Sequence, residues 1–311
     1  MSVIKDGLIG LAVGDAMGVP LQSIERKRLF NDPVTSMIGY GSYDVPEGVW
    51  STYTSMTLAT MDSIIKCGKI NFDDMASRFC NFVGKGEYTA IGKAFDISTT
   101  TKKALNRYLK IQGDAVKCGL TDIDSNDNGS LIRMFPIALY CHFNKLKDYE
   151  IFNIVKNASS ITHANEVSIL GCYIYVSYLL FILNGKDKLA SYNMIKCLDF
   201  SSYFDEDTIA YYNRLLKTNI SNLRIDDLKS TDYVIYTLES AMWIILKTNS
   251  YSEAIVGSIN LGGATDKIGA TAGSIAGILY GFNEIPSKWI YKLKRFDYLE
   301  EMAENFENLF I

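Results

Sequence analysis

Residues 260–281 read NLGGATDKIGATAGSIAGILYG. A Gly-Gly turn opens this stretch, and small residues then recur at three- and four-residue spacing, at Gly269, Ala272, Gly273, Ala276 and Gly277. This spacing places them on one face of a helix, which can then pack very close to another helix or to a ligand. Thr265 suits the N-cap, and Asp266 suits the first turn, where a carboxylate faces the positive end of the helix dipole. The stretch predicts a central helix whose N-terminus faces a site.

A second glycine-rich stretch complements the first. Residues 3–17 predict a helix, and glycines recur on one of its faces at Gly7, Gly10, Gly14 and Gly18. Glycine costs up to about 1 kcal/mol per helical position relative to alanine. Four of them on one face indicate close packing, and we expect this face to contact the small-residue face of 260–281.

Helical periodicity dominates the rest of the chain. Apolar residues recur mostly at three- and four-residue spacing, and strict alternation is rare. The chain has 311 residues, of which 48% are hydrophobic and 21% charged, enough for a well-buried core. We therefore expect an all-α fold of roughly a dozen helices, in a single domain over residues 1–311 and without strands.

Several segments are expected to connect or cover this core. Residues 31–49 predict a loop that ends where Trp50 opens a second core helix, and 120–130 predict a polar loop that leads into a helix near Leu131. Residues 184–233 are more polar and indicate peripheral helices without chemistry, and the chain closes with an amphipathic segment over 289–310.

Composition excludes several classes of function. The net charge is −4 and no basic block occurs, which argues against nucleic-acid binding. Six well-separated cysteines without a C-x-x-C pair, and the absence of a signal-peptide pattern, favour a reduced, cytoplasmic setting. Only two histidines occur, which excludes an H-E-x-x-H zinc site, and no G-x-S-x-G elbow is present.

One segment bears on membrane association. Residues 167–183 (VSILGCYIYVSYLLFIL) carry no charge over roughly the shortest length that spans a bilayer. The segment contains several Tyr and Ser, and no second span accompanies it. We expect a fully buried core helix and no membrane contact.

Five separated motifs in order resemble those of the ADP-ribosylglycohydrolase family. They are GLAVGDAMGVPLQ (10–22), GVWSTYTSM (48–56), SNDNGSLIRMFP (125–136), Thr162-His163 and GGATDKIGATAGSIAGILYG (262–281); FDISTTTKKAL (95–105) also resembles a family segment. The resemblance implies an all-α orthogonal bundle. It also implies cleavage of the bond that joins ADP-ribose to an acceptor such as arginine or serine, with two Mg²⁺ in a central cleft.

Such a centre requires several carboxylates. Mg²⁺ takes oxygen ligands, and two metal ions about 3.5–4 Å apart repel each other. In the family the negative charge comes from a Thr-Asp-Asp-Thr segment after the Trp, from an Asp and an Asp-Thr pair in the last motif, and from a Glu that ends the first motif.

This chain departs from that pattern at nearly every position. Ser51, Thr52 and Tyr53 follow the Trp, so both aspartates are absent. Gln22 replaces the Glu, Ala264 replaces the first Asp of the last motif, and Lys267 replaces the Thr; only Asp266 of five expected acidic groups remains. One carboxylate does not hold two Mg²⁺, so we expect a degenerate metal site and no cofactor.

Asp266 and Lys267 are the candidate catalytic residues. The ammonium of Lys267 would replace part of the missing metal charge, with Asp266 as its partner. The ordinary alternative is a carboxylate at a helix start and a solvated lysine.

The residues that the resemblance assigns to ligand binding match the family better than those that it assigns to the metal ions. Ser125, Asn128 and Gly129 match the family loop that contacts the diphosphate and ribose, and backbone N–H groups in such a turn suit phosphates. His163 matches a histidine near the diphosphate or distal ribose; the alternative is a core histidine bonded to a backbone group. Further ligand-binding candidates are Gln22, Thr52 and Tyr53, whereas Arg133 and Asp15 are expected to be structural.

Three functions remain open at this point. The first is a family member that has lost Mg²⁺-dependent hydrolysis, a pseudoenzyme or immunity-type factor that binds ADP-ribose, an ADP-ribosylated protein or an ADP-ribosylating toxin. The second is an active hydrolase with altered, metal-free chemistry, which needs only a well-placed acid or base. The third is a structural protein whose cleft is filled, with Tyr53 as the plug. We favour the first.

Overall fold

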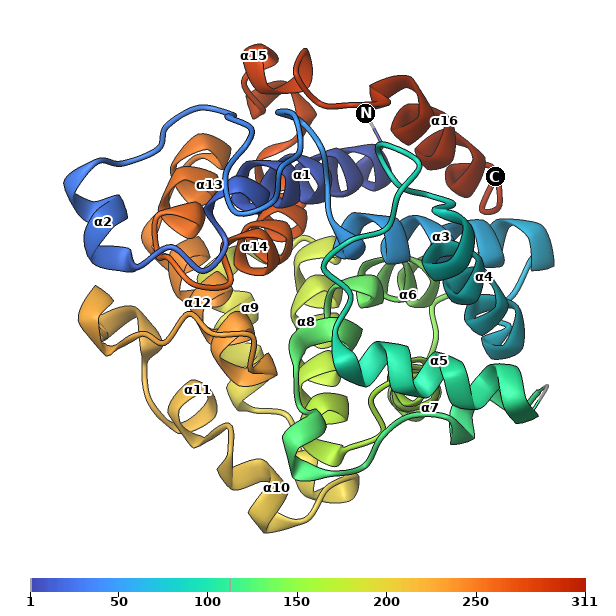
Figure 1. The fold of residues 1–311 in the computed structure, drawn as a ribbon. Helices are drawn as coiled ribbons and strands as arrows, with labels where there is room; N and C mark the ends of the chain where they lie inside the picture. The colour runs from blue at the N-terminus through green and yellow to red at the C-terminus, as the bar shows by residue number, and fades with distance from the viewer. Residues whose placement is uncertain (1, 112) are drawn as a thin grey trace.

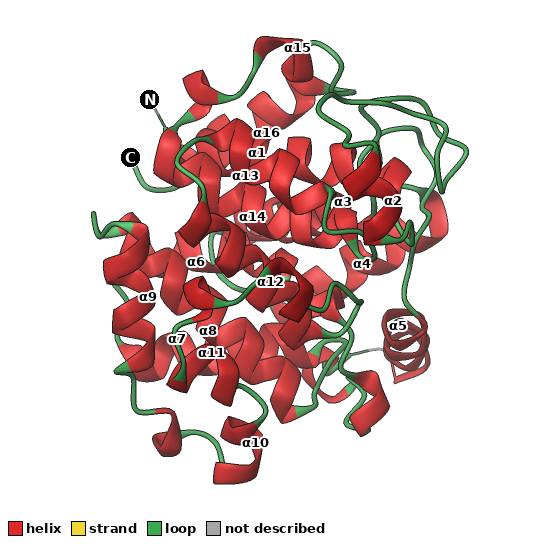
Figure 2. Cartoon of the chain, turned by 90° about the vertical axis from the view of Figure 1, so that its left-hand side faces the viewer, coloured by secondary structure: helices red, strands yellow, loops and turns green. Residues whose placement is uncertain are grey.

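The computed structural model describes residues 2–111 and 113–311 (Figure 1). Within these residues it contains sixteen α-helices, short 3₁₀ turns and no strand, as Figure 2 also shows. The all-α prediction is therefore confirmed. The helices are α1 (Val3–Gly18), α2 (Arg26–Asn31), α3 (Thr52–Cys67), α4 (Phe72–Lys85), α5 (Thr99–Ile111), α6 (Phe135–Phe143), α7 (Asp148–Ser160), α8 (Glu166–Leu183), α9 (Lys188–Lys196), α10 (Glu206–Ala210), α11 (Asn213–Lys217), α12 (Val234–Lys247), α13 (Tyr251–Ile259), α14 (Thr265–Tyr280), α15 (Ser287–Ile290) and α16 (Phe296–Glu307).

Helices α1 and α14 form the most closely packed pair (Figure 1). A methyl group added at Gly10 would overlap the carbonyl oxygen of Gly273, and one added at Gly14 would overlap that of Gly269. The two backbones thus touch along their glycine faces, as the spacing predicted. This contact fixes the N-terminus of α14 with respect to the loops that follow α1.

Helix α8 packs against α6, α7, α9 and α12. It is the one helix in the described chain that is long and apolar enough, by length and composition alone, to cross a membrane. Within the protein 78% of this stretch is buried. Its apolar surface therefore packs against neighbouring helices, as expected of a core helix.

Three local predictions require correction. Thr265 is not the N-cap of α14: Ala264 holds that position, and the Thr265 hydroxyl donates to the carbonyl of Gly18 at 2.8 Å. The helix expected near Leu131 begins at Phe135, because 3₁₀ turns occupy 123–125, 128–130 and 132–134. The second core helix begins at Thr52, two residues after Trp50, with Ser51 as its N-cap.

Candidate functional site

A cavity of about 290 Å³ lies at the N-terminus of α14. Five parts of the chain line it: the start of α3, the loop before α5 with the first residues of α5, the turns before α6, Asp232 in the loop before α12, and Lys267 in the first turn of α14. All of these parts except Asp232 lie in or directly beside the family-like motifs, so the fold brings together segments that are far apart in the sequence. The lining residues that matter below are Tyr53, Asp96, Asp127, Asn128, Asp232 and Lys267.

Lys267 projects from the first turn of α14 into a group of carboxylates. Its Nζ lies 2.6 Å from Asp96 Oδ2, 3.1 Å from Asp266 Oδ2 and 3.6 Å from Asp232 Oδ1. Only 3% of its side chain is exposed, so it is not the solvated lysine of the ordinary alternative. Burial by itself would lower the pKa of Lys267, but these carboxylates raise it above the ordinary value. The ammonium therefore keeps its charge inside the protein.

Asp266 is the most deeply placed carboxyl group of the site. It is fully buried, and neither of its oxygens accepts a hydrogen bond with good geometry. Burial raises the pKa of Asp266 well above its ordinary value, although the charge of Lys267 opposes the shift. The shortest ion pair of the site joins Lys267 to Asp96, at 2.6 Å.

The residues of this site do not fit a pair of Mg²⁺ ions. Where the resemblance expects carboxylates, Thr52 donates its hydroxyl to the carbonyl of Phe95 at 2.6 Å, and Ala264 has no side-chain oxygen. The ring of Tyr53 lies 5.4 Å from Lys267 Nζ, a cation–π contact. An ammonium among the few remaining carboxylates would repel a divalent cation, so we assign no chemical step to Mg²⁺.

Asp96 is held by a second polar residue. Gln22 Nε2 donates to Asp96 Oδ1 at 3.4 Å, a long hydrogen bond, and the Gln22 side chain is buried. Gln22 therefore contacts the ion-pair group and does not line the cavity itself.

Asp127 takes the hydrogen-bond donors that the resemblance assigns to a diphosphate. Its Oδ1 accepts from Gly129 N at 3.0 Å and contacts His163 Nε2 at 2.8 Å. The other ring nitrogen of His163 contacts the Thr162 hydroxyl at 2.7 Å. His163 is therefore bonded to two side chains, and the alternative of a histidine bonded only to a backbone group is wrong. These two donors are therefore already engaged by an internal carboxylate.

Asn128 and Tyr53 close the inner wall of the cavity. The Tyr53 hydroxyl donates to Asn128 Oδ1, and Asn128 Nδ2 donates to the Thr237 hydroxyl at 2.7 Å. Ser125, by contrast, is buried and does not line the cavity. Of the three loop candidates, the structure places the side chain of Asn128 at the cavity and the backbone N–H of Gly129 against Asp127.

Two residues expected to be structural brace this region. Asp15 accepts hydrogen bonds from Ser51 N and from both the backbone N and the hydroxyl of Thr54, at 2.6–3.1 Å. Burial raises the pKa of Asp15 to about 6, although these hydrogen bonds oppose the shift. Arg133 is buried and donates to the carbonyls of Ala158 and Ser159. Both side chains hold helices and loops together behind the cavity.

Three carboxylates of the site were not recognised in the sequence. Asp96 and Asp127 lie inside the quoted motifs, and this location in a motif was the only sign in the sequence that they belong to the site. Asp232 lies in 184–233, the region where no chemistry was expected, and the loop before α12 places it at the cavity. No periodicity marks such a loop residue.

Protonation of Asp127 is expected to destabilise the protein at low pH. Burial would raise the pKa of Asp127, but His163 lowers it from 3.8 to about 2. The resulting stabilisation, about 2 kcal/mol, is complete above about pH 4 and is lost as the pH falls towards 2. Urea unfolding of the wild type and of Asp127→Asn between those pH values should show the difference in unfolding free energy shrinking. A difference that does not change with pH would contradict the pairing.

Comparison with known proteins gives a consistent result. The profile of the family described as ADP-ribosylglycohydrolase matches residues 2–311. The chain is 31% identical over 303 residues to ADP-ribosylarginine hydrolase Tri1 of Serratia proteamaculans, and the match covers 96% of this chain and 77% of the relative. It is 22% identical to the ADP-ribosylhydrolase ARH3 of Homo sapiens, over 100% of this chain and 94% of the relative. A solved structure titled "ADP-ribosylglycohydrolase-related protein complex" superposes with a TM-score of 0.82 at 22% identity, over 100% of this chain and 98% of the other.

Proposed function

The chain belongs to the ADP-ribosylglycohydrolase family, and we propose that it binds the ADP-ribosyl group of a modified protein without the Mg²⁺-dependent hydrolysis of its relatives. The relative from Serratia proteamaculans is named as an ADP-ribosylarginine hydrolase. That name supports an ADP-ribosylated protein as the partner. An ADP-ribosylating toxin, whose product carries the same group, is the other partner that fits the proposal.

One observation carries this proposal: the ammonium of Lys267 stands where the family pattern would complete its metal site. Its ion pairs with Asp96 and Asp232 neutralise carboxylates that would otherwise attract a divalent cation. Hydrolysis with two metal ions needs those ions to activate water and to stabilise developing charge. A tethered ammonium neutralises charge but does not lower the pKa of a bound water in that way.

The structure favours the metal-free hydrolase less. Asp266 is buried and does not line the cavity. A general acid or base must come within hydrogen-bond reach of the proton it transfers. If Asp266→Asn abolished a measurable release of ADP-ribose, this alternative would gain the support that it lacks.

Binding of ADP-ribose requires the diphosphate to compete with Asp127. Both are anions that seek the same donors, Gly129 N and His163 Nε2. We therefore expect weak binding of ADP-ribose by the wild type. Asp127→Asn should bind it at least about tenfold more tightly, because the variant removes the carboxylate that competes for these donors. Charge-assisted hydrogen bonds to the freed donors are worth about 1.4 kcal/mol or more.

Calorimetric titration with ADP-ribose tests this proposal. The affinity of the wild type should be the same with Mg²⁺ as with a chelator, and so should the affinity of Asp127→Asn. Asp124→Asn is the matched control, because Asp124 is an exposed carboxylate on the same cavity that pairs with neither donor. No heat of binding by either protein, or an affinity that depends on Mg²⁺, would overturn the proposal.

A further inference from the structure

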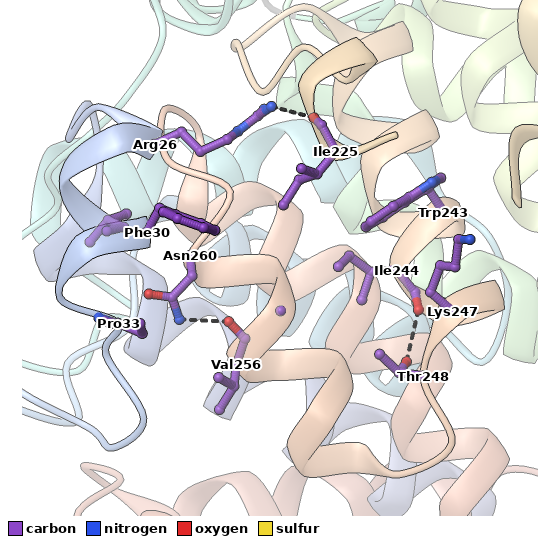
Figure 3. Close-up of a pocket in the computed structure, with 12 residues that line it drawn as sticks. Arg26, Phe30, Pro33, Ile225, Trp243, Ile244, Lys247, Thr248, Val256 and Asn260 are labelled. Atoms are coloured by element: carbon purple, nitrogen blue, oxygen red, sulfur yellow. Dashed lines mark hydrogen bonds between the residues drawn. The ribbon is translucent and has the colours of Figure 1, made fainter. Parts of the chain in front are cut away.

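An open apolar groove lies between α2 on one side and α12 and α13 on the other (Figure 3). It consists of a hollow of about 410 Å³ and an adjoining hollow of about 520 Å³. The two hollows share Arg26, Phe30 and Ile225, so they adjoin and form one groove. Figure 3 shows Phe30 on one side of the first hollow and Trp243 on the other, with Ile225 at the rim.

The walls of this groove expose apolar side chains that other elements leave uncovered. Phe30 is 75% exposed and Ile225 is 37% exposed. Burying one such side chain stabilises a complex by about 1.5–3 kcal/mol. Because one wall is this open, a small molecule in the groove would stay half-exposed, whereas small-molecule sites bury about 70–90% of the surface of their ligand. A segment of another protein fits the groove better.

The charges on the groove are mostly positive. Arg26, Lys27 and Lys247 line it, and Asp226 is its one carboxylate. In the part of the chain that the structure describes, none of these cations lies within 4 Å of a carboxylate oxygen. The chain as a whole carries a net charge of −4, so this local excess of positive charge is distinctive. Charge complementarity therefore favours an acidic partner.

The guanidinium of Arg26 links the groove to the cavity described above. It donates to the carbonyls of Leu261 and Leu228 at 2.8 and 3.0 Å, and also to that of Ile225. The same loop continues to Ser230, whose carbonyl accepts from Ala264 N at 2.7 Å, and to Asp232 beside Lys267. A segment bound in the groove would thus lie beside the loop that forms one wall of the cavity.

We propose that this groove docks an acidic segment of a partner protein, one that inserts two large apolar side chains and places carboxylates over Lys27 and Lys247. The two apolar side chains occupy the two hollows on either side of Phe30 and Ile225. Recognition of this kind uses a few apolar anchors for affinity and charges at the rim for orientation and partner choice. The docking surface is separate from the cavity, so its role does not depend on whether ADP-ribose binds.

Fluorescence anisotropy with synthetic peptides tests the docking surface. The probe is a short fluorescein-labelled peptide with Phe and Leu at its centre and Asp at both ends; the comparison peptide has Lys in place of Asp. The Asp peptide should bind at least about tenfold more tightly than the Lys peptide, and its affinity should fall as salt rises from 0.05 to about 0.5 M. Phe30→Ser and Lys247→Glu should each weaken binding at least about fivefold, since both residues line the groove.

Two exposed residues outside the groove provide matched controls. Tyr291→Ser removes an aromatic side chain that is 88% exposed, and Lys288→Glu reverses an exposed charge. Neither should change the affinity for the Asp peptide. Equal binding of the two peptides, no binding up to about 1 mM, or unchanged binding by Phe30→Ser and Lys247→Glu would overturn the proposal. Phe30→Ser should bind ADP-ribose with the same affinity as the wild type. A failure of peptide docking can then be distinguished from a failure of ADP-ribose binding in the cavity.

Discussion

Lys267→Met is expected to lower the free energy of unfolding by about 3–5 kcal/mol at pH 7. Methionine has a similar length but no charge, so Asp96, whose side chain is only 15% exposed, would lose its cation. Removal of one partner from a buried ion pair leaves an uncompensated charge in a poorly solvated place, which is the main cost. Urea unfolding at pH 7 measures this loss.

Lys292→Met provides the matched control for this prediction. Lys292 also pairs with a carboxylate, that of Glu47 at 2.7 Å, but 39% of its side chain and 43% of that of Glu47 are exposed. Exposed pairs contribute about 0–1 kcal/mol, so this variant should change stability by no more than that. Losses of equal size in the two variants would show that Lys267 is not the internal cation that the cleft depends on.

Gly14→Ala is the second change with a large expected effect. The new methyl group would overlap the carbonyl of Gly269, because α1 and α14 touch backbone to backbone at this point. No side-chain rotation relieves such a clash, so the helices must move apart, at a cost of about 3 kcal/mol. The N-terminus of α14 would move with them, and thermal unfolding should show a clear drop in Tm.

Gly84→Ala is the control, and it is expected to leave stability unchanged or to raise it slightly. Gly84 lies near the end of α4, and a methyl group there would meet no other atom within 4 Å. Alanine favours the helical backbone by up to about 1 kcal/mol over glycine, so this variant should be as stable as the wild type or slightly more stable. If Gly14→Ala were equally harmless, the close approach of α1 and α14 would be wrong.

The contrast between these two glycines shows what the sequence could predict. Glycines at three- and four-residue spacing in both α1 and α14 indicated the contact, because spacing decides which residues share a helical face. The same reasoning says nothing about Gly84, which stands alone. Periodic signals thus predicted the helices and their closest contact.

The ion pairs of the cleft could not be predicted in the same way. Asp96 and Lys267 are 171 residues apart, and Asp96 lies in a loop with a backbone φ of 55°. The sequence indicated that Lys267 replaces a family threonine, but only the fold shows which carboxylates surround it. Asp127 is a similar case. The sequence showed that it lies in the motif, but it did not predict that its side chain contacts Gly129 N and His163 Nε2.

The most direct test of the account is an assay for the release of ADP-ribose from a protein that is ADP-ribosylated on arginine. The purified chain is incubated with this substrate in parallel with Mg²⁺ and with a chelator, and free ADP-ribose is measured by chromatography. Since we propose that the ammonium of Lys267 takes the place of metal charge, we expect no release above the uncatalysed background under either condition. Release that appears with Mg²⁺ and disappears with the chelator would contradict the account.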